Sequence, residues 1–266
     1  MTISNNVLIY RGQGADPTCV DATTTKISQL YSRDYSIIQV DQSYLERENN
    51  PYLYVLPGGN AMDMGNSLKK VAEKIKNSVN KGSGLLGFCA GAMVATSNWK
   101  YHNPCYSPAF GWVNTVDDEF FADQPRLNFP SITAVGPTYH DLTKVQPDPR
   151  LAEIVSTDKK QSYHCFWDKG PVLYSSDLKH RIIAQYTYPT NPYIDTINPN
   201  TIQAAAIHTL YGLGSIVLLG VHPELTSWAE RKGHSFTPYD IEQNDLLFKE
   251  SCHLVGLDKK RMTSIE

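Results

Sequence analysis

Residues 85–93 read LLGFCAGAM and place Cys89 at the end of an apolar run, with a glycine two positions before it and another two positions after it. This G-x-C-x-G spacing predicts a nucleophile elbow, a sharp strand-to-helix turn that presents one side chain above a sheet. The backbone of such a nucleophile is strained, so its neighbours at these positions must be small, as Gly87 and Gly91 are. A buried structural cysteine in a tight turn is the alternative interpretation.

The helix expected after the elbow favours chemistry at Cys89 in two ways. Its N-terminal end carries partial positive charge, which favours the reactive thiolate over the thiol. The backbone N–H of Ala90 is expected to face an oxyanion that forms beside the sulfur. The sequence therefore indicates a cysteine nucleophile, provided that the fold supplies a base.

A candidate base follows much later in the chain, in LLGVHPEL at residues 218–225. His222 ends an apolar strand, and Glu224 stands two residues on, with Pro223 stiffening the link. On an extended chain, residues i and i+2 share a face, so both side chains are expected to point toward one sulfur. A Cys-His-Glu triad is therefore predicted, with His222 as the base and Glu224 orienting it. Without the elbow, His222 would be interpreted as an ordinary strand-end histidine.

A second glycine motif, VLPGGN at residues 55–60, ends another expected strand. Glycines let backbone N–H groups approach a ligand closely, so Gly59 joins Ala90 as a candidate oxyanion donor and Gly58 is a candidate substrate contact. Sites in parallel sheets form beyond the carboxyl ends of the strands, which is where this motif is expected. An ordinary Gly-Gly turn is the alternative.

Strands and helices are expected to alternate over the first hundred residues. Strands are predicted at residues 7–10, 36–40, 52–59 and 84–88. Asp16 and Pro17 predict the start of a helix that runs to about residue 32 and buries Val20, Ile27 and Leu30. A second helix is predicted over residues 66–82 from the apolar spacing of Leu68, Val71, Ile75 and Val79, and a third after Cys89. Such alternation predicts a parallel sheet with helices on both faces.

The middle of the chain, residues 99–200, is rich in Pro, Tyr, Asn and Asp and predicts short strands. The candidates are residues 131–135, 162–167, 171–175 and 181–188. No linker brackets this segment, so we interpret it as a β-rich elaboration within a single domain covering residues 1–266. Residues 204–224 are expected to form a hairpin, although their first half is also compatible with a helix, and a last helix is predicted over residues 238–253.

The composition excludes several classes of protein. The chain has 266 residues, of which 41% are hydrophobic and 19% charged, as in globular proteins. A net charge of -3 gives no electrostatic basis for binding nucleic acid, and no apolar run is long enough to span a membrane. The start of the chain lacks the features of a signal peptide. Five scattered cysteines without a CxxC pair favour a reducing, cytoplasmic compartment and predict no metal site.

Three of these motifs, in this order, resemble the class I glutamine amidotransferase-like superfamily: Pro57-Gly58-Gly59, the Cys89 elbow and His222-Pro223-Glu224. The resemblance implies a flavodoxin-like, three-layer α/β/α sandwich with a mostly parallel central sheet and a Cys-His-Glu triad. Within the superfamily, the chain is similar to the amidotransferase-like N-terminal domain of biotin-protein ligases. This likeness rests on the segments LIYRGQGA, GFCAGAMVA, AVGPTY, FWDKGPVL and GVHPEL.

The resemblance implies two further site residues and shows one departure. It places Trp167 and Asp168 in a loop that lines the pocket, as candidates for stacking and polar anchoring. Glutamine-using members carry Gln four residues after the nucleophile, where this chain has Met93. A thioether cannot make the hydrogen bonds that an amino-acid substrate needs, so free glutamine is not the expected substrate. The sequence also lacks a biotin-loop signature, so we expect this chain not to attach biotin.

Other polar residues have simpler alternatives. Arg11, at the end of the first strand, is a candidate for binding a substrate carboxylate, although a solvated loop arginine is the simpler interpretation. His140 and His164 are candidate ligands or pocket residues if the middle segment covers the site. The other cysteines have no elbow and no base beside them in sequence, and we interpret them as structural thiols: Cys19, Cys105, Cys165 and Cys252.

Two main classes of function remain open. The leading hypothesis is an enzyme that cleaves an amide or related acyl bond of a small molecule through a Cys89 thioester, without a cofactor. The alternative is a catalytically idle binding or regulatory module that keeps the site as a ligand pocket, which Met93 would suit. A glyoxalase or chaperone on the same fold usually needs an acidic residue near the end of the first strand, where only Asp16 is available.

Overall fold

The computed structural model describes residues 3–48, 50–100, 129–135, 150–159, 161–175, 180–187 and 203–257. Its strands are β1 (Asn6–Tyr10), β2 (Ser36–Val40), β3 (Leu53–Leu56), β4 (Gly84–Phe88), β5 (Thr96–Lys100), β6 (Phe129–Val135), β7 (Leu151–Ser156), β8 (Tyr163–Phe166), β9 (Val172–Ser175), β10 (Arg181–Tyr186), β11 (Ala204–Tyr211) and β12 (Gly214–Leu219). Its helices are α1 (Pro17–Tyr31), α2 (Gln42–Arg47), α3 (Ala61–Leu68), α4 (Ala72–Asn80), α5 (Ala90–Ala95), the 3-10 helix η3 (Pro223–Leu225), α7 (Thr226–Arg231) and α8 (Pro238–Leu254).

The first five strands of the sheet follow the doubly wound order of flavodoxin-like folds. They run β2-β1-β3-β4-β12 and all pair in parallel. Beyond β12 the sheet continues through β11, β10, β7 and β8, and every one of these pairs is antiparallel. The chain therefore has an α/β fold with a mixed central sheet, of which the half that contains β1 to β4 is parallel throughout.

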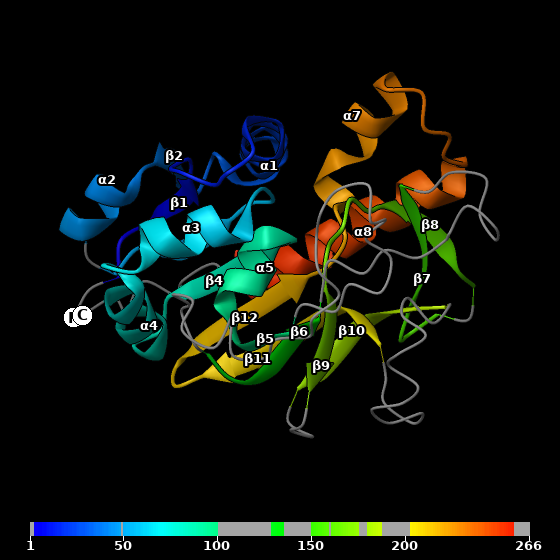
Figure 1. The fold of residues 1–266 in the computed structure, drawn as a ribbon. Helices are drawn as coiled ribbons and strands as arrows, with labels where there is room; N and C mark the ends of the chain where they lie inside the picture. Colours follow the sequence, from blue (N-terminus) through cyan, green and yellow to red (C-terminus); the bar gives the residue numbers. More distant parts are fainter. Residues whose placement is uncertain are drawn as a thin grey trace, which may run out of the picture.

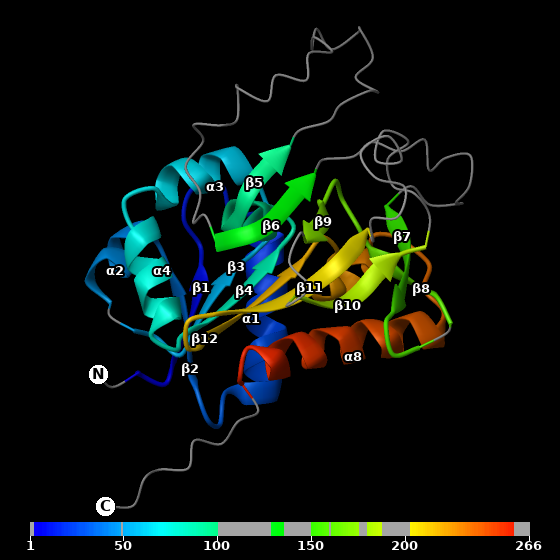
Figure 2. The ribbon, with the colours of Figure 1, turned by 90° about the horizontal axis from the view of Figure 1, so that it is seen from below.

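Alternating side chains of the parallel strands bury two separate apolar clusters, one on each face of the sheet. In β1, Val7 and Ile9 pack with residues of α1 and α8, whereas Leu8 and Tyr10 pack with residues of α3 and α4. This period of two is what a strand buried on both faces requires. Figure 2 shows α1 and α8 on one side of the sheet and α3 and α4 on the other, which makes three layers.

The middle of the chain adds strands to the same sheet. Strands β10, β7 and β8 extend it past the hairpin, and β9 joins β11 to the pair formed by β5 and β6. Figure 1 shows β7, β8 and β10 at the end of the sheet remote from α2 and α4, with β8 beside α8. Among the described residues, no helix is both long and apolar enough to cross a membrane.

Most elements predicted from the sequence are confirmed. The hairpin over residues 204–224 forms with paired strands β11 and β12, and α8 begins after Thr237, as predicted. Asp16 caps α1 through bonds to two backbone N–H groups, and Pro17 is its first residue. Strands β5 and β7 and helices α2 and α7 were not predicted, because each is short and lacks a clear apolar period.

Two details of the helical predictions are wrong. The segment 66–82 is not one helix, because a turn at residues 69–71 separates α3 from α4. Apolar spacing could not show the break, since Leu68 just before the turn and Val71 at its end are both buried. In α1, Leu30 is 40% exposed and Tyr31 is buried instead, because the buried stripe continues from Ile27 by four residues.

Candidate active site

Cys89 lies at a strained turn between β4 and α5. Its φ of 48° and ψ of -108° lie in a region that residues with a side chain rarely adopt. Its N–H donates to the carbonyl oxygen of Leu219 at 2.8 Å, which ties the turn to the end of β12. Because such a conformation costs about 1–3 kcal/mol, it persists only where the surrounding structure enforces it. The backbone geometry is that of a nucleophile elbow.

The two glycines of the elbow are required by close backbone contacts. A Cβ atom on Gly87 would lie 3.0 Å from the N atom of Ala92 and from Gly91. A Cβ atom on Gly91 would overlap the carbonyl oxygen of Leu56 in the neighbouring strand. The N–H of Gly91 also donates to the carbonyl oxygen of Pro57 at 3.1 Å. The small residues therefore allow the elbow to pack against the end of β3.

His222 and Glu224 form a buried pair where the chain leaves β12. Nδ1 of His222 donates to Oε1 of Glu224 at 2.7 Å, and both side chains are almost completely buried. The backbone N–H of His222 donates to the carbonyl oxygen of Phe166 at 2.8 Å, which fixes the position of the residue. The pair was expected because residues i and i+2 share a face on an extended chain. This reason is wrong, because the chain at Glu224 forms a 3-10 turn, although the pair itself forms.

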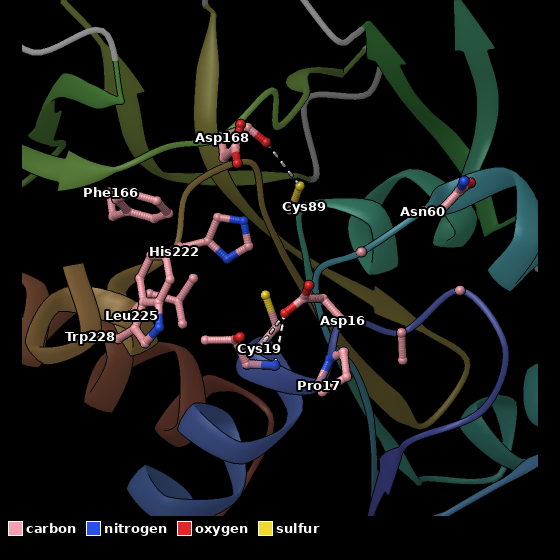
Figure 3. A pocket seen from close by; sticks show the side chains of 14 residues that line it. Asp16, Pro17, Cys19, Asn60, Cys89, Phe166, Asp168, His222, Leu225 and Trp228 are labelled. Carbon is pink, nitrogen blue, oxygen red and sulfur yellow. Dashed lines mark hydrogen bonds between the residues drawn. The ribbon is translucent and has the colours of Figure 1, made fainter. Parts of the chain in front are cut away.

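The surroundings of His222 favour its protonated form. Burial alone would lower the pKa of its imidazole, but the charge of Glu224, and then the charge and hydrogen bond of Cys89, raise this pKa well above its ordinary value. The ring thus lies between the carboxylate on one side and the sulfur on the other. Figure 3 shows the imidazole of His222 beside Cys89 at the edge of the pocket. Cys89 also donates a weak hydrogen bond to the carbonyl oxygen of Asp168 at 3.8 Å.

The Pro57-Gly58-Gly59 turn makes room for the histidine. A Cβ atom on Gly58 would lie 2.5 Å from Cε1 of His222 and 2.9 Å from Sγ of Cys19. Gly59 has a φ of 149° and forms a bridge with Ala15. Only a residue without a side chain lets these segments approach so closely.

Two N–H groups near Cys89 fit the expected role of oxyanion donors. The bridge beside Gly59 is made by the N–H groups of Asp16 and Asn60, so it does not use the N–H of Gly59. Ala90 is the first residue of α5, and first-turn N–H groups have no acceptor within their own helix. Both groups lie in segments that flank the sulfur.

A cavity of about 470 Å³ opens beside Cys89, and its walls come from the ends of β1, β3, β4, β8 and β12 and the segments that follow them. Figure 3 shows the side chains that line it. Cys89, His222, Gly59 and Asp168 were predicted at the site and line this cavity. Its other lining residues are Gly14, Ala15, Asp16, Pro17, Thr18, Cys19, Asn60, Phe166, Leu225 and Trp228. The cavity is large enough for a small-molecule ligand.

Several lining residues were missed, although one signal pointed to some of them. Asp16 and Asn60 lie just beyond the ends of β1 and β3, so the rule that sites form at carboxyl strand ends would have found both. Phe166 and Trp228 come from segments whose position cannot be derived from a local pattern. Their rings contact each other with centroids 5.6 Å apart and form an apolar wall.

Four predicted substrate contacts do not line this cavity. Gly58 instead packs against the side chains of His222 and Cys19. Nη1 of Arg11 donates to Oε1 of Gln39 at 2.5 Å, on the exposed surface. Met93 is buried in the apolar cluster that includes Met64 and Leu68. The indole of Trp167 is also buried, and its Nε1 donates to the carbonyl oxygen of Gly170 at 3.0 Å. Trp167 therefore shapes the loop that holds Asp168, but its own ring is not part of the cavity wall.

Cys19 was interpreted as a structural thiol, and its position does not fit that interpretation. It is in the first turn of α1, and its sulfur faces Gly58 and His222 across the cavity. Burial, followed by the charges of Glu224 and Asp16, raises the pKa of its thiol far above the ordinary value. The site thus contains a second, neutral sulfur, for which no local sequence pattern provides a signal.

Of the two other candidate histidines, His164 does not line the cavity. The N–H of His164 donates to Asp240 at 2.6 Å, and its ring lies 3.5 Å from the same carboxylate, so this residue joins β8 to α8. His140 lies outside the described residues, as does Cys105. The remaining described cysteines, Cys165 and Cys252, are completely buried.

Comparison with known proteins agrees with this fold. The family model for the N-terminal part of biotin-protein ligases matches residues 5–255. A biotin–protein ligase of Schizosaccharomyces pombe is 26% identical over 230 residues, which are 84% of this chain and 34% of that protein. The chain thus spans about a third of the length of this relative.

A solved structure has the same overall fold. A chain of PurLQS from Thermotoga maritima aligns with a TM-score of 0.50 and 11% sequence identity. The alignment covers 93% of this chain and 100% of that one. At this level of identity the likeness concerns the fold alone.

Proposed function

Because the chain belongs to the family of biotin-protein ligase N-terminal domains and has an amidotransferase-like fold, we propose that it is a cysteine-dependent enzyme that cleaves an amide or related acyl bond. The observation that carries this proposal is the elbow at Cys89 beside the buried His222–Glu224 pair. A strained turn, a buried ion pair and a cavity at one point of a fold are costly to maintain without a use.

The proposed reaction follows from the positions of these groups. Cys89 attacks the acyl carbon as the thiolate, with its proton held on the imidazole of His222. The carbonyl oxygen becomes an oxyanion that accepts hydrogen bonds from the N–H groups of Gly59 and Ala90. The protonated His222 then gives its proton to the leaving amine or alcohol, and the C–N or C–O bond breaks to leave a thioester.

Water completes the proposed cycle. His222, now neutral, takes a proton from a water molecule that attacks the thioester carbon. The C–S bond then breaks, the acid is released, and the sulfur and imidazole return to their starting forms. Glu224 holds the ring in place and stabilises its charge throughout, through the bond of 2.7 Å to Nδ1. The cycle needs no cofactor.

The cavity favours a small-molecule substrate other than free glutamine. Glutamine-using relatives are expected to have a hydrogen-bonding Gln at position 93. In this chain the residue is Met93, whose thioether is buried in the apolar cluster. The wall of Phe166 and Trp228 fits an apolar part of a ligand, whereas Asp16 and Asp168 add negative charge at the rim. An amide or ester with an apolar or cationic group therefore matches the cavity better than a substrate recognised by its carboxylate.

One observation favours the second candidate, a binding module without catalysis. Cys89 is 6% exposed, and its hydrogen bond is directed to the carbonyl oxygen of Asp168. A protein that only binds a ligand could keep the Cys89 sulfur buried and hydrogen-bonded in this way without any reaction at the sulfur. The two functions differ in whether a covalent adduct forms on Cys89.

Intact-mass spectrometry during incubation with a panel of small amides and esters tests the proposal. We expect an adduct of the acyl mass on the wild-type chain that is removed on dilution, and none on Cys89→Ser. His222→Gln should slow its formation by about 100-fold or more. Cys252→Ser, which alters a buried cysteine within α8, is the matched control and should behave as wild type. Ligand binding without any adduct would support the binding module instead.

A further inference from the structure

Three buried side chains beside the cavity bring a sulfur, a nitrogen and an oxygen close together. Cys19 comes from the start of α1, His222 from the end of β12 and Glu224 from η3. One ligand atom of each lies within 4.8 Å of the corresponding atoms of the other two. Their exposed fractions are 6%, 2% and 4%, so these atoms are shielded from bulk water.

The carboxylate of Glu224 has an unused oxygen in this cluster. Oε1 accepts the hydrogen bond from His222, but Oε2 is buried and has no hydrogen-bond partner among the described residues. An unsatisfied buried carboxylate oxygen is costly, because the water that it loses on burial is not replaced. A bound cation would satisfy it.

We propose that Cys19, His222 and Glu224 form a binding site for Zn²⁺. A thiolate sulfur, an imidazole nitrogen and a carboxylate oxygen are the donors that Zn²⁺ takes, in tetrahedral geometry and at about 2.0–2.3 Å from the metal. Tetrahedral ligands at those distances are roughly 3.3–3.8 Å apart. Small side-chain rotations that move each ligand atom by about an ångström would bring the three atoms into position.

Metal binding and the proton relay use the same atoms and exclude each other. The thiol of Cys19 must release its proton to the solvent, and His222 must lose the proton with which Nδ1 now bonds to Glu224. The bound metal then stands in place of that proton, so the imidazole can no longer serve as an acid or base. The expectation that bound Zn²⁺ inhibits the reaction rests on the proposed function. The expectation that Zn²⁺ binds does not.

Titration with Co²⁺, which takes the place of Zn²⁺ and absorbs visible light in tetrahedral sites, tests the proposal. The full chain is first treated with a chelator and a thiol reductant. We expect one Co²⁺ per chain, with thiolate-to-metal charge-transfer and tetrahedral d–d absorption, and displacement by one equivalent of Zn²⁺. Cys19→Ser should weaken binding by at least about 10-fold and remove charge transfer from this sulfur.

Substitutions at the other proposed ligands show which side chains hold the metal. Glu224→Gln should also weaken binding by about 10-fold, and circular dichroism will show whether each variant is folded. Cys252→Ser should bind as wild type does. Absence of tetrahedral absorption in the folded wild type, or equal absorption in folded Cys19→Ser and Glu224→Gln, would overturn the proposal.

A parallel measurement of acyl-adduct formation keeps the two proposals apart. Metal binding by a chain that never forms an adduct would leave the zinc site standing and contradict the proposed enzyme. Adduct formation that Zn²⁺ does not slow, in a chain that binds no Co²⁺, would leave the enzyme standing and contradict the zinc site.

Discussion

At the scale of single residues, position 58 shows how the absence of a side chain shapes the site. The imidazole of His222 and the sulfur of Cys19 occupy the space that a Cβ atom on Gly58 would need. A methyl group there must move one of them, and the histidine is held between Glu224 and Phe166 by hydrogen bonds. The glycine is therefore as necessary for the pair with Cys89 as the histidine is.

Gly58→Ala should disable the site without unfolding the protein. We expect the reaction of Cys89 with acyl substrates to slow by about 100-fold, because a shift of about an ångström in a catalytic group has an effect of this size. Intact-mass kinetics measure the rate, and circular dichroism checks the fold. A folded variant that reacts at the wild-type rate would show that His222 need not lie where the structure places it.

Glu224→Gln tests the electrostatics of the pair. The carboxylate raises the pKa of His222 against the effect of burial, so its removal should lower that pKa, and the ring should lose its proton at a lower pH. NMR titration of the histidine ring signals measures the change, and signals of histidines remote from the site should not move. A titration of His222 that is the same in both proteins would contradict the assigned cause.

The residues of the site differ in how far the sequence determines them. Cys89, Gly87 and Gly91 could be predicted, because the elbow is a local structure with a local sequence requirement. The position of Cys19 in the site could not, since it depends on how α1 lies against the Pro57-Gly58-Gly59 turn. Met93 was assigned by its spacing from Cys89, but spacing does not show that its side chain points into the core.

At the scale of elements, the start of α8 joins the helix to the sheet. Asp240 accepts hydrogen bonds from the N–H and hydroxyl of Thr237, which complete a capping box, and from the N–H of His164 in β8. Burial alone would raise the pKa of Asp240, but these bonds lower it below its ordinary value. One carboxylate thus serves both the cap and the contact between two elements.

Two substitutions should separate these roles. Thr237→Ala removes the cap alone and should cost about 1 kcal/mol of unfolding free energy. Asp240→Asn should cost about 2–3 kcal/mol, because it also weakens a charge-assisted bond to β8. Urea unfolding measures both, and equal losses would contradict the second role.

The pH dependence of Asp240→Asn has a definite sign. A carboxylate whose pKa is lowered by folding stabilises the protein above its unfolded pKa of about 3.9, and this contribution disappears as the pH falls through the lower folded value. The difference between wild type and variant should therefore be full at pH 6 and should shrink below about pH 4. A difference that grows with acidity would be contrary to this account.

The elements that the sequence predicted well are those with a cap and a regular apolar period. Helices α1 and α8 begin at Asp16 and Thr237, where side-chain caps meet a following proline. The turn between α3 and α4 has no such signal, because α4 begins at Val71 without a side-chain cap. Helix α7 follows η3 directly and is also uncapped by a side chain, which explains why it was missed.

At the scale of the whole molecule, the apolar cluster under α1 and α8 includes residues from both parts of the chain. Val7 and Phe88 of the parallel strands share it with Ile154, Tyr163 and Ile183 of the β-rich segment. Separate folding of the two parts would leave much of this surface exposed. This shared core is the physical basis for the proposal of a single domain.

A single cooperative unfolding transition is the expected consequence. Urea curves followed by tryptophan fluorescence and by far-ultraviolet circular dichroism should coincide if the chain unfolds as one unit. The two probes report on different parts, because Trp167 belongs to the β-rich segment and the described helices lie outside it. Two separated transitions would show that the β-rich segment unfolds on its own and would contradict the proposal of one domain.

The topology was predictable only in part. Alternation of strands and helices determines the parallel order, since short right-handed crossovers leave few other arrangements. The antiparallel extension through β10, β7 and β8 could not be derived, because strands in a polar, proline-rich segment have no local rule that selects their partners.

The rate at which each cysteine is alkylated by iodoacetamide at neutral pH, measured by peptide mapping, tests the central claim most directly. We expect Cys89 to react at least about 10-fold faster than Cys19, Cys165 and Cys252, because the imidazole of His222 can take the proton of its thiol, whereas these three thiols are buried without such a base. Burial raises the pKa of Cys19 and of Cys165 well above the ordinary value, which should keep both slow. His222→Gln should abolish the preference for Cys89. No preference for Cys89 in the wild type, or a preference that survives His222→Gln unchanged, would contradict an activated nucleophile at the elbow.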